Sequence, residues 1–369
     1  NCSQKNSITY GVVQPGAALD AGKPLIRVNN FKDGRLDLSD VMYIAPDIES
    51  KYSRTRLVGG EVLLTVVGSV GQVATVPSNL AGFNVARAVA VIHPLPHIEP
   101  RWIAICLRSP LSQHLLGSRA NTTVQTTINL KDLRALPIPL PPVDERRTIG
   151  EFLSGLDVRI TLLRETNATL EAIAQALFKS WFVDFDPVRA KMEGRTPEGM
   201  DEATAALFPD GFETSELGEV PRGWRVGMIG DFAQLKKGSV NPGSQPEVTF
   251  EHFSLPSFDA GQRPIFELGE SIKSNKTPVT QDAVLLSKLN PHIPRIWLPV
   301  ECGSNAVCST EFLVFVPTGA GSRELIYCAF SSPDFIARLQ QLVTGTSNSH
   351  QRIKPDQVAL MSSVVPNAD

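Results

Sequence analysis

Polar side chains that can hydrogen-bond to the bases of DNA gather in two distant parts of the sequence. Arg suits guanine, and Asn or Gln suits adenine, because each forms two hydrogen bonds with the major-groove edge of that base. In the first part the candidate contacts are Lys51, Arg54, Arg56, Asn84, Arg87, Asn121, Thr122, Thr123 and Gln125. In the second part they are Lys236, Lys237, Lys288, Asn290, His292, Arg295, Ser347, Asn348, His350 and Arg352. A solvated loop residue is the alternative at each single position, so the clusters are stronger candidates than their members.

The short motifs of nucleotide and zinc hydrolysis are missing, because the sequence contains no GxxxxGK, GxGxxG or HExxH. Pro46-Asp47 with Glu49 and Lys51 comes nearest to a nuclease pattern. Its carboxylates stand too close in sequence for a metal site built from separate strands. The five cysteines form no CxxC pair, which argues against a zinc site and a disulfide framework. They are Cys2, Cys106, Cys302, Cys308 and Cys328. The sequence therefore predicts a binding protein without a catalytic site, metal or cofactor of its own.

Composition and charge permit nucleic-acid binding without requiring it. At 369 residues the chain exceeds the usual size of one domain, so two domains are expected. The net charge is −3, whereas a nucleic-acid-binding domain is usually basic. The charge is uneven: residues 1–143 carry 14 Lys and Arg against 9 Asp and Glu, and residues 184–222 carry 4 against 10. No apolar run approaches a membrane span, and the first ten residues lack the apolar core of a signal peptide, so we expect a cytoplasmic location and no membrane partner.

An internal repeat with an offset of 222 or 223 residues organises the sequence. The repeated residues are, in pairs, Val62-Leu63-Leu64 and Val284-Leu285-Leu286, Arg101 and Arg323, Cys106 and Cys328, Ser109-Pro110 and Ser332-Pro333, and Lys131 and Lys354. A long period that occurs twice indicates duplicated domains. Each Val-Leu-Leu run predicts a buried strand, followed by a second apolar run and then by a helix pair in which Ser caps and Pro begins the second helix. The helix pairs are expected at about residues 101–116 and 324–343.

Residues 144–183 have the heptad spacing of a coiled-coil helix. Apolar positions alternate spacings of three and four, which is the pattern of a seam that packs on another helix. The seam consists of Leu153, Leu156, Ile160, Leu163, Asn167, Leu170, Ala174, Leu177 and Trp181. Asn167 either fixes the register of the seam or faces solvent on a slightly rotated helix. At 1.5 Å per residue the helix would be about 60 Å long, which predicts a rigid spacer.

Residues 184–222 form an acidic segment that we interpret as an ordered connector. Pro187 is expected to end the long helix. Four aromatic side chains are expected to anchor the connector: Phe182, Phe185, Phe208 and Phe212. The predicted fold class is therefore α+β, with two related domains, 1–143 and 223–369, separated by the long helix 144–183 and the connector 184–222.

The residues around the long helix form an extended motif. It consists of Ile138-Pro-Leu-Pro-Pro-Val-Asp-Glu-Arg-Arg147, Asn167-Ala-Thr-Leu-Glu-Ala-Ile-Ala-Gln-Ala-Leu-Phe-Lys-Ser-Trp-Phe182, Val183-Asp-Phe-Asp-Pro-Val-Arg-Ala-Lys191, Leu207-Phe-Pro-Asp210 and Ser215-Glu-Leu-Gly-Glu-Val-Pro-Arg-Gly-Trp224. This motif resembles the central region of type I restriction specificity subunits. The first domain is similar to that family's first target-recognition domain through Tyr10-Gly-Val-Val-Gln-Pro-Gly16 and Gly68-Ser-Val-Gly71.

The resemblance implies a non-catalytic, sequence-specific DNA-recognition subunit of a type I restriction-modification complex. In this family two target-recognition domains flank antiparallel helices, and each domain reads one half of a bipartite target in double-stranded DNA. The subunit binds two methyltransferase subunits, and a motor-nuclease subunit completes the complex. S-adenosylmethionine belongs to the methyltransferase. This chain lacks the Asn/Asp-Pro-Pro-aromatic motif with which such adenine methyltransferases hold the flipped base.

Two features depart from the family pattern. Family members usually begin before the equivalent of Tyr10 and carry a second long helix after the second domain, where this sequence stops at Asp369. Either the sequence is shortened, or the protein is a short form whose seam pairs with another chain. A protein-interaction scaffold without specific DNA readout is the alternative function, and salt-dependent DNA binding would separate the two. Gly68 and Gly71 either let the backbone approach DNA or form a tight turn.

Overall fold

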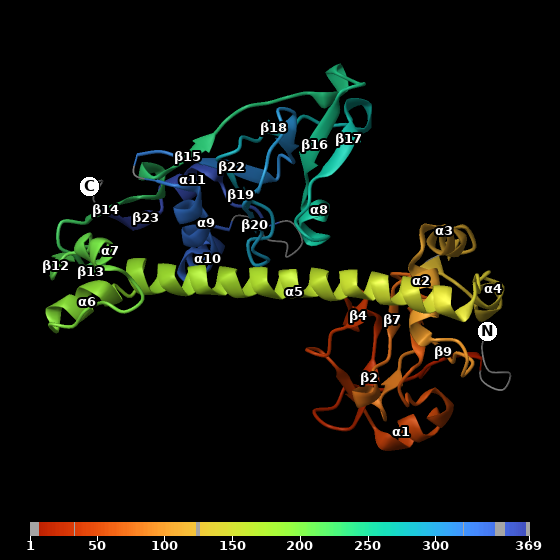
Figure 1. The fold of residues 1–369 in the computed structure, drawn as a ribbon. Coiled ribbons are helices and arrows are strands. Elements are labelled where there is room, and N and C mark those ends of the chain that lie inside the picture. The colour runs from red at the N-terminus through yellow and green to blue at the C-terminus, as the bar shows by residue number, and fades with distance from the viewer. Residues whose placement is uncertain (1–6, 33, 123–125, 320, 344–350, 367–369) are drawn as a thin grey trace. The chain divides into compact units, whose positions relative to one another are not determined.

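The computed structural model describes residues 7–32, 34–122, 126–319, 321–343 and 351–366. The chain divides into two compact units, Asn1–Leu163 and Arg164–Asp369. The division falls within helix α5 (Val143–Phe182), so each unit contains one half of that helix. Both units combine strands and helices, which agrees with the predicted α+β class (Figure 1). This division does not test the predicted domain borders at residues 143 and 223, which stay a prediction.

The first unit contains two small sheets. One has the antiparallel order β1-β9-β6-β7; the other has the order β5-β2-β8, with β2 antiparallel to β5 and parallel to β8. The strands are β1 (Ile8–Tyr10), β2 (Lys23–Ile26), β5 (Met42–Ile44), β6 (Val62–Thr65), β7 (Val73–Thr75), β8 (Asn84–Val85) and β9 (Val89–Ile92). Two short hairpins are β3 (Phe31–Lys32) with β4 (Arg35–Leu36), and β10 (Asn121–Thr122) with β11 (Thr126–Thr127).

Strand β6 is buried on both faces, which explains its uninterrupted apolar sequence. Successive side chains of a strand point to opposite faces. Val62 and Leu64 therefore pack in one cluster with Ile103 of the helix pair, whereas Leu63 packs in a second cluster with Val85. The predicted buried strand is confirmed.

The helices of the first unit are α1 (Pro46–Ser50), α2 (Pro100–Arg108), α3 (Pro110–Ser118) and α4 (Leu130–Arg134), besides α5. Ser109 alone joins α2 to α3. Its Oγ accepts a hydrogen bond from the backbone N–H of Ser112 (3.3 Å), and Pro110 occupies the first turn of α3, where the lack of an N–H costs nothing. This arrangement confirms the predicted Ser cap and Pro start.

The second unit repeats the topology of the first. Its four-stranded sheet has the order β15-β22-β19-β20, and its second sheet has the order β17-β16-β21-β18. Leu285 lies opposite Val314 as Leu63 lies opposite Val91, and β16 is antiparallel to β17 and parallel to β21 as β2 is to β5 and β8. The strands are β15 (Ala233–Lys236), β16 (Thr249–Phe253), β17 (Ile265–Leu268), β18 (Thr277–Pro278), β19 (Val284–Ser287), β20 (Ile296–Trp297), β21 (Ala306–Cys308) and β22 (Phe312–Pro317). The predicted internal repeat is confirmed by this strand order.

The helix pair also recurs in the second unit. Helices α9 (Arg323–Ser331) and α10 (Pro333–Gln341) are joined by Ser332, whose Oγ accepts from the backbone N–H of Phe335 (3.3 Å). Helix α11 (Pro355–Ala359) takes the place of α4, and α8 (Leu255–Asp259) follows β16. The pair β14 (Arg225–Met228) and β23 (Ser362–Val365) has no counterpart among the described residues of the first unit.

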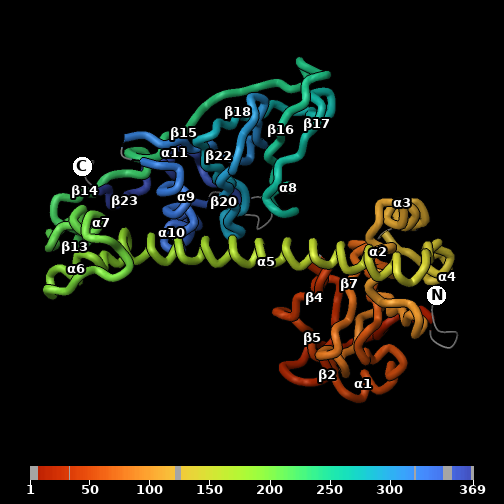
Figure 2. The backbone as a smooth tube through the Cα atoms, viewed as in Figure 1, coloured from red at the N-terminus to blue at the C-terminus, as the bar shows by residue number. Residues whose placement is uncertain are grey.

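Helix α5 runs without interruption for 40 residues, so the predicted long helix is confirmed to within one residue at each end (Figure 2). In the first unit, Arg146 in its first turns is buried beside Glu99 (3.7 Å). In the second unit, Glu171 forms a hydrogen bond with Tyr327 of α9. Burial and this contact with Glu171 raise the pKa of Tyr327, so the phenol stays protonated.

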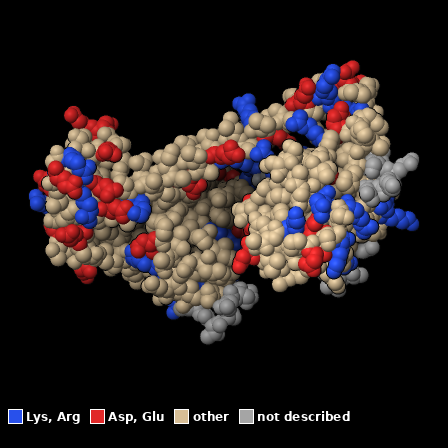
Figure 3. Space-filling model, turned by 90° about the horizontal axis from the view of Figure 1, so that it is seen from below, with Lys and Arg blue, Asp and Glu red and all other residues tan. Residues whose placement is uncertain are grey.

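The connector is ordered and folds around aromatic side chains. It consists of α6 (Asp186–Met192), α7 (Glu202–Ala206) and the hairpin β12 (Phe212–Ser215) with β13 (Gly218–Pro221). The predicted anchors Phe182, Phe185, Phe208 and Phe212 cluster with Trp181 and Trp224. The ring centroids of Phe182 and Phe185 each lie 5.9 Å from that of Trp224. Acidic side chains gather on the surface of this part, at the left of Figure 3.

The prediction that Pro187 ends the long helix is wrong. Helix α5 ends at Phe182, and Phe185 adopts a left-handed conformation (φ 56°) that separates it from α6. Pro187 lies in the first turn of α6, because its fixed φ suits that position and its missing N–H needs no partner there. No helix in the described part of the chain is long and apolar enough to cross a membrane.

Candidate nucleic-acid interface

Three basic candidates of the first unit lie on one short segment, residues 46–56, which we call the basic arm. It comprises α1 and a turn of 3-10 helix at Ser53–Thr55. Lys51 and Arg54 are exposed, and neither forms an ion pair or a side-chain hydrogen bond with another described residue. Arg56 is engaged within the arm, because its Nε and Nη2 donate to Glu49 Oε1 (2.8 Å) and Oε2 (2.6 Å).

Asn84 is completely buried, so its prediction as a DNA contact is wrong. Its Nδ2 donates to Glu49 Oε1 and to the carbonyl oxygen of Tyr52, both at 3.1 Å, and its Oδ1 accepts from Thr55 Oγ1 (2.8 Å). A side chain without exposed surface, whose polar atoms all have partners inside the domain, cannot reach a base edge. Asn84 instead fastens the basic arm to strand β8.

Glu49 is the centre of this network, and sequence reasoning missed its role. The hydrogen bonds from Arg56 hold the pKa of Glu49 below its ordinary value, against the opposing effect of burial, and the bond from Asn84 adds to them. The carboxylate therefore stays charged in the interior. A signal was available in the alternation of acidic and basic residues between Asp47 and Arg56, but the partner Asn84 is 35 residues from Glu49.

The turn after β6 and the hairpin β10–β11 together form a second polar loop region of the first unit. The Gly68 N–H donates to the carbonyl oxygen of Thr126 (3.0 Å), and the N–H of Ile128 donates to that of Val66 (2.9 Å). Gly68 has φ +77° with open space around it. Gly71 has φ +96°, and a Cβ there would lie 2.5 Å from Gln113 Oε1. The turn conformation thus accounts for both glycines.

The polar candidates of this hairpin are only partly covered by the structure. Asn121 and Thr122 form strand β10, which pairs with β11. Thr123 and Gln125 lie outside the described residues. Arg87, from the loop between β8 and β9, is exposed, and its backbone N–H donates to the carbonyl oxygen of Val12 (2.8 Å).

The second unit joins its two polar loop regions in the same way. The Asn290 N–H donates to the carbonyl oxygen of Gln351 (2.8 Å), and the N–H of Ile353 donates to that of Lys288 (3.1 Å). Asn290 stands 222 residues after Gly68 and shares its left-handed conformation, with φ +51°. Asn is one of the few residues besides Gly that adopts this conformation readily. The structure thus brings together the segments that carry Lys288, Asn290 and Arg352.

Two predicted arginines of the second unit are held by carboxylates. Arg295 donates to Asp259 through Nε (2.7 Å) and Nη2 (2.9 Å), and its side chain is only 13% exposed. Arg352 donates to Glu311 through Nε (3.2 Å) and Nη2 (3.0 Å). Sequence reasoning missed both pairs, because the partners lie 36 and 41 residues apart. These contacts hold the loops in place.

The remaining described candidates of the second unit are Lys236, Lys237 and His292, and His292 lies in the same loop as Asn290. Lys236 Nζ lies 3.4 Å from Thr280 Oγ1, and Lys237 and His292 are exposed. The last three candidates, Ser347, Asn348 and His350, lie outside the described residues.

The apolar seam of α5 is exposed along most of its length. Leu163 is 55% exposed and Leu170 58%, and exposed seam residues also include Leu156, Ile160, Asn167, Ala174 and Leu177, whereas Leu153 is partly buried. Trp181 does not continue this exposed seam, because it packs edge-on against Phe208 of the connector (5.9 Å between ring centroids). Exposed apolar side chains in such a row favour a helical partner.

The sequence analysis missed a second apolar stripe on α5. Val158, Leu162 and Ile173 are each more than half exposed. At 100° per residue, Val158 and Leu162 lie on the side of the helix away from the neighbouring seam residues, whereas Ile173 lies about 60° from Leu170 of the seam. The helix therefore presents two apolar faces.

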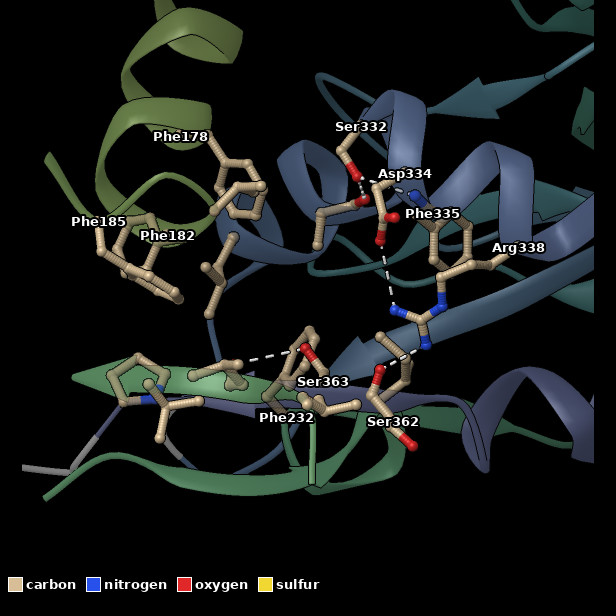
Figure 4. Close-up of a pocket in the computed structure, with 18 of the residues that line it drawn as sticks. Phe178, Phe182, Phe185, Phe232, Ser332, Asp334, Phe335, Arg338, Ser362 and Ser363 are labelled. Carbon is tan, nitrogen blue, oxygen red and sulfur yellow. Dashed lines mark hydrogen bonds and ion pairs between the residues drawn. The ribbon is translucent and has the colours of Figure 1, made fainter. Parts of the chain in front are cut away.

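A cavity of about 520 Å³ lies in the second unit, between the end of α5, the helix pair α9–α10 and strand β23. Figure 4 shows aromatic rings such as Phe178 and Phe335 on its walls. Two of its charged groups are engaged with each other: Arg338 pairs with Asp334 (3.4 Å) and donates to the carbonyl oxygen of Ser362 (2.5 Å), whereas Glu219 is exposed at the lining. The lining therefore offers mainly apolar surface.

Metal and thiol chemistry find no support in the described residues. No group of three His, Cys, Asp or Glu side chains among them is placed to hold a metal ion. Burial raises the pKa of Cys308 to about 12 and that of Cys302 to about 11. A thiol that stays protonated is a poor nucleophile and a poor metal ligand.

Comparison with known proteins matches the first unit and the start of the second to one family. Residues 14–172 match the type I restriction modification DNA specificity domain. The chain is 34% identical over 179 residues to the type I restriction enzyme EcoBI specificity subunit of Escherichia coli, a match covering 46% of this chain and 38% of that protein. It is 31% identical over 223 residues to the HindI specificity subunit of Haemophilus influenzae, covering 48% of each. The matches thus span about half the length of these relatives or less.

A solved structure of a type I restriction-modification S subunit from M. genitalium superposes over 98% of this chain and 83% of that chain, with 14% identity and a TM-score of 0.46. The fold and the loops define a protein built from two copies of one α+β domain, each with an equivalent pair of polar loops. The sequence matches relate part of the chain to one family. Residues 14–172 match the type I restriction modification DNA specificity domain, and the chain is similar over about half its length to type I restriction enzyme specificity subunits.

Proposed function

We propose that this chain is the DNA-recognition subunit of a type I restriction-modification complex and that each of its two domains reads one half of a bipartite target. The observation that carries the proposal is the duplication: one topology occurs twice, and the same pair of polar loops meets at Gly68 and at Asn290. Because the two loop regions differ in side chains, two different half-sites would be read. The family match of residues 14–172 supports the same function.

Helix α5 would act as the spacer between the two reading domains. An uninterrupted helix of 40 residues is about 60 Å long and bends little. Half-sites on one face of DNA recur at multiples of about 34 Å, so a rigid helix can select one separation. The bases between the half-sites would remain unread.

The chain would act by directing partners, without a catalytic role of its own. We infer that methyltransferase subunits bind it and modify adenine, that S-adenosylmethionine is bound by those subunits, and that a motor-nuclease subunit completes the complex. The exposed seam of α5 supports such an assembly, because a row of apolar heptad positions lowers its free energy when another helix covers it. Action on cellular DNA places the complex in the cytoplasm.

Salt-dependent binding to duplex DNA tests this function against a scaffold without DNA readout. A protein that neutralises phosphates releases counterions, so the logarithm of its affinity falls linearly with the logarithm of the salt concentration. We expect a steep negative slope for the chain with its methyltransferase. A complex that assembles with the methyltransferase but binds duplex DNA with no salt dependence would favour the scaffold.

A further inference from the structure

The geometry points to a phosphate-binding arm in the first domain. We infer that Lys51 and Arg54 bind the sugar-phosphate backbone of DNA and that Glu49 positions them through Arg56 and Asn84. The inference rests on the proposed function and specifies what the acidic and basic residues between Asp47 and Arg56 do in it.

Hydrogen bonds of Glu49, within the arm, attach the arm to the rest of the domain. The Glu49 side chain is 1% exposed, and three N–H groups from Arg56 and Asn84 donate to its two oxygens at 2.6 to 3.1 Å. Thr55 is also buried and donates to Asn84. Removing any partner leaves a buried polar group without a hydrogen bond, so the network holds the arm in one conformation.

The two remaining cations of the arm point into solvent. Lys51 and Arg54 lie between Glu49 and Thr55 in the sequence, are exposed, and have no partner among the described residues. Arg56 already neutralises Glu49, so the carboxylate does not compete for them. Unpaired Lys and Arg on a rigid support suit phosphate oxygens, which receive half or more of all protein–DNA hydrogen bonds.

The second domain has no such network among its described residues. Strands β8 and β21 occupy equivalent places, since Asn84 lies beside Leu25 of β2 as Ala306 lies beside Glu251 of β16. Ala306 has no side-chain donor, and Pro278 stands 222 residues after Arg56. The arm is therefore particular to the first domain, which agrees with the excess of basic residues over positions 1–143.

The network also explains why the nuclease-like pattern around Pro46 is not a metal site. A metal ligand must offer free oxygen lone pairs in a site with other ligands. Both oxygens of Glu49 are taken by Arg56 and Asn84. The carboxylate serves to position cations.

The test measures the salt dependence of binding to a mixed-sequence DNA duplex by fluorescence anisotropy, with the full chain and its methyltransferase. Each phosphate contact contributes about 0.9 to the slope. The double variant Lys51→Ala/Arg54→Ala should therefore lower the magnitude of the slope by about two. Its loss of affinity should be about twelvefold greater at about 50 mM than at about 200 mM salt, as the slope difference requires. Arg195→Ala, which removes one positive charge from the exposed surface of the connector, should leave the slope unchanged.

The positioning role is tested by combining variants. Glu49→Gln should lower DNA affinity in the unmodified arm but cause no further loss in the Lys51→Ala/Arg54→Ala background, because no cations remain to position. Arg56→Lys, which keeps the charge and loses the two-point contact, provides the same test if Glu49→Gln fails to fold. An equal loss in both backgrounds would overturn the positioning role.

The outcomes separate this inference from the proposed function. Salt-dependent binding whose slope is the same with and without Lys51 and Arg54 would overturn the phosphate-binding arm alone. Absence of salt-dependent DNA binding by the unmodified complex would overturn the proposed function and the arm with it. A slope reduced by the double variant, unchanged by Arg195→Ala, supports both.

Discussion

At the scale of single residues, Glu49 shows how the chain keeps a carboxylate charged in its interior. Burial alone would raise the pKa of such a group and neutralise it. The two-point contact with Arg56 reverses this effect and lowers the pKa of Glu49, with a contribution from Asn84. The charge-assisted hydrogen bonds of Arg56 are shorter and stronger than neutral ones. The stability of the first domain should therefore depend on the charge of this residue.

A pH series tests this dependence. Because the folded pKa of Glu49 is depressed, its contribution to stability is fully present above the ordinary Glu value and is lost as the pH falls through the folded value. Glu49→Gln should thus destabilise the first domain at pH 7 by about 1.5 to 3 kcal/mol, and the difference should shrink below about pH 4. Urea denaturation at several pH values measures it. Asp47→Asn, an exposed neighbour on the same helix, should change stability by less than about 0.5 kcal/mol.

Gly68 and Asn290 make a second prediction at this scale. Both adopt a positive φ at the same point of the duplicated loop, and open space surrounds Gly68. Gly68→Asn should therefore be tolerated, whereas Gly68→Val should cost about 1 to 3 kcal/mol through backbone strain alone. Thermal unfolding compares the two variants. Equal destabilisation by Asn and Val would show that the space around Gly68, and not its φ, limits this position.

Side-chain roles were the least predictable part of the sequence. Lys51, Arg54 and Arg87 are exposed as a DNA contact requires, but Asn84 is buried although its neighbours in sequence gave no warning. Asn84 is buried because it hydrogen-bonds to Glu49. Glu49 is 35 residues away in the sequence and comes close to Asn84 only in the folded chain. A prediction that uses only residue type and local spacing cannot identify a hydrogen-bond partner that is distant in the sequence. Ion pairs such as Arg295 with Asp259 are missed for the same reason.

At the scale of elements, α5 is the feature that local sequence determines best. Its heptad spacing continues over five turns and more, so the helix is predicted to within one residue at each end. Its exposed seam and the exposed Val158 and Leu162 on its other side show that one helix can carry two apolar faces. Only the seam has the continuous spacing that a coiled-coil partner requires.

Paired substitutions on the two faces test the seam. Leu163→Asp with Leu170→Asp should weaken assembly with the methyltransferase about a hundredfold or more, because each buried Leu contributes about 1.5 to 3 kcal/mol. Val158→Asp with Leu162→Asp introduces the same charges on the other face and should leave seam pairing intact. Co-purification measures both, with circular dichroism to confirm that the helix persists. Equal losses from both faces would contradict a role specific to the seam.

The short elements could not be predicted. Strand β8 has two residues, Asn84–Val85, and β18 has two, Thr277–Pro278. Neither shows a period, because each is defined by pairing with a strand distant in sequence. The break between α5 and α6 lies at Phe185, before Pro187. Phe185 has a left-handed backbone conformation there, which the residue type Phe does not predict. In contrast, the Ser-Pro steps at Ser109 and Ser332 combine a cap and a first-turn proline, and this local signal held in both units.

At the scale of the whole molecule, duplication is the property from which the proposed function follows. Few residues recur between the copies, yet strand order, register and the loop contacts at Gly68 and Asn290 coincide. Among the described residues, the basic arm with its Glu49 network occurs in the first copy and has no counterpart in the second. Two domains with one scaffold and different loops are suited to read two different sequences.

The most direct test of this account is a map of methylated adenines in DNA from a cell that expresses the chain with its methyltransferase. The account predicts a motif of two defined blocks, separated by a fixed number of unspecified bases. Exchange of the loop that contains Asn290 should change one block and leave the other block and the gap unaltered. A continuous motif, or methylation without any sequence preference, would contradict the claim that two duplicated domains each read one half of the target.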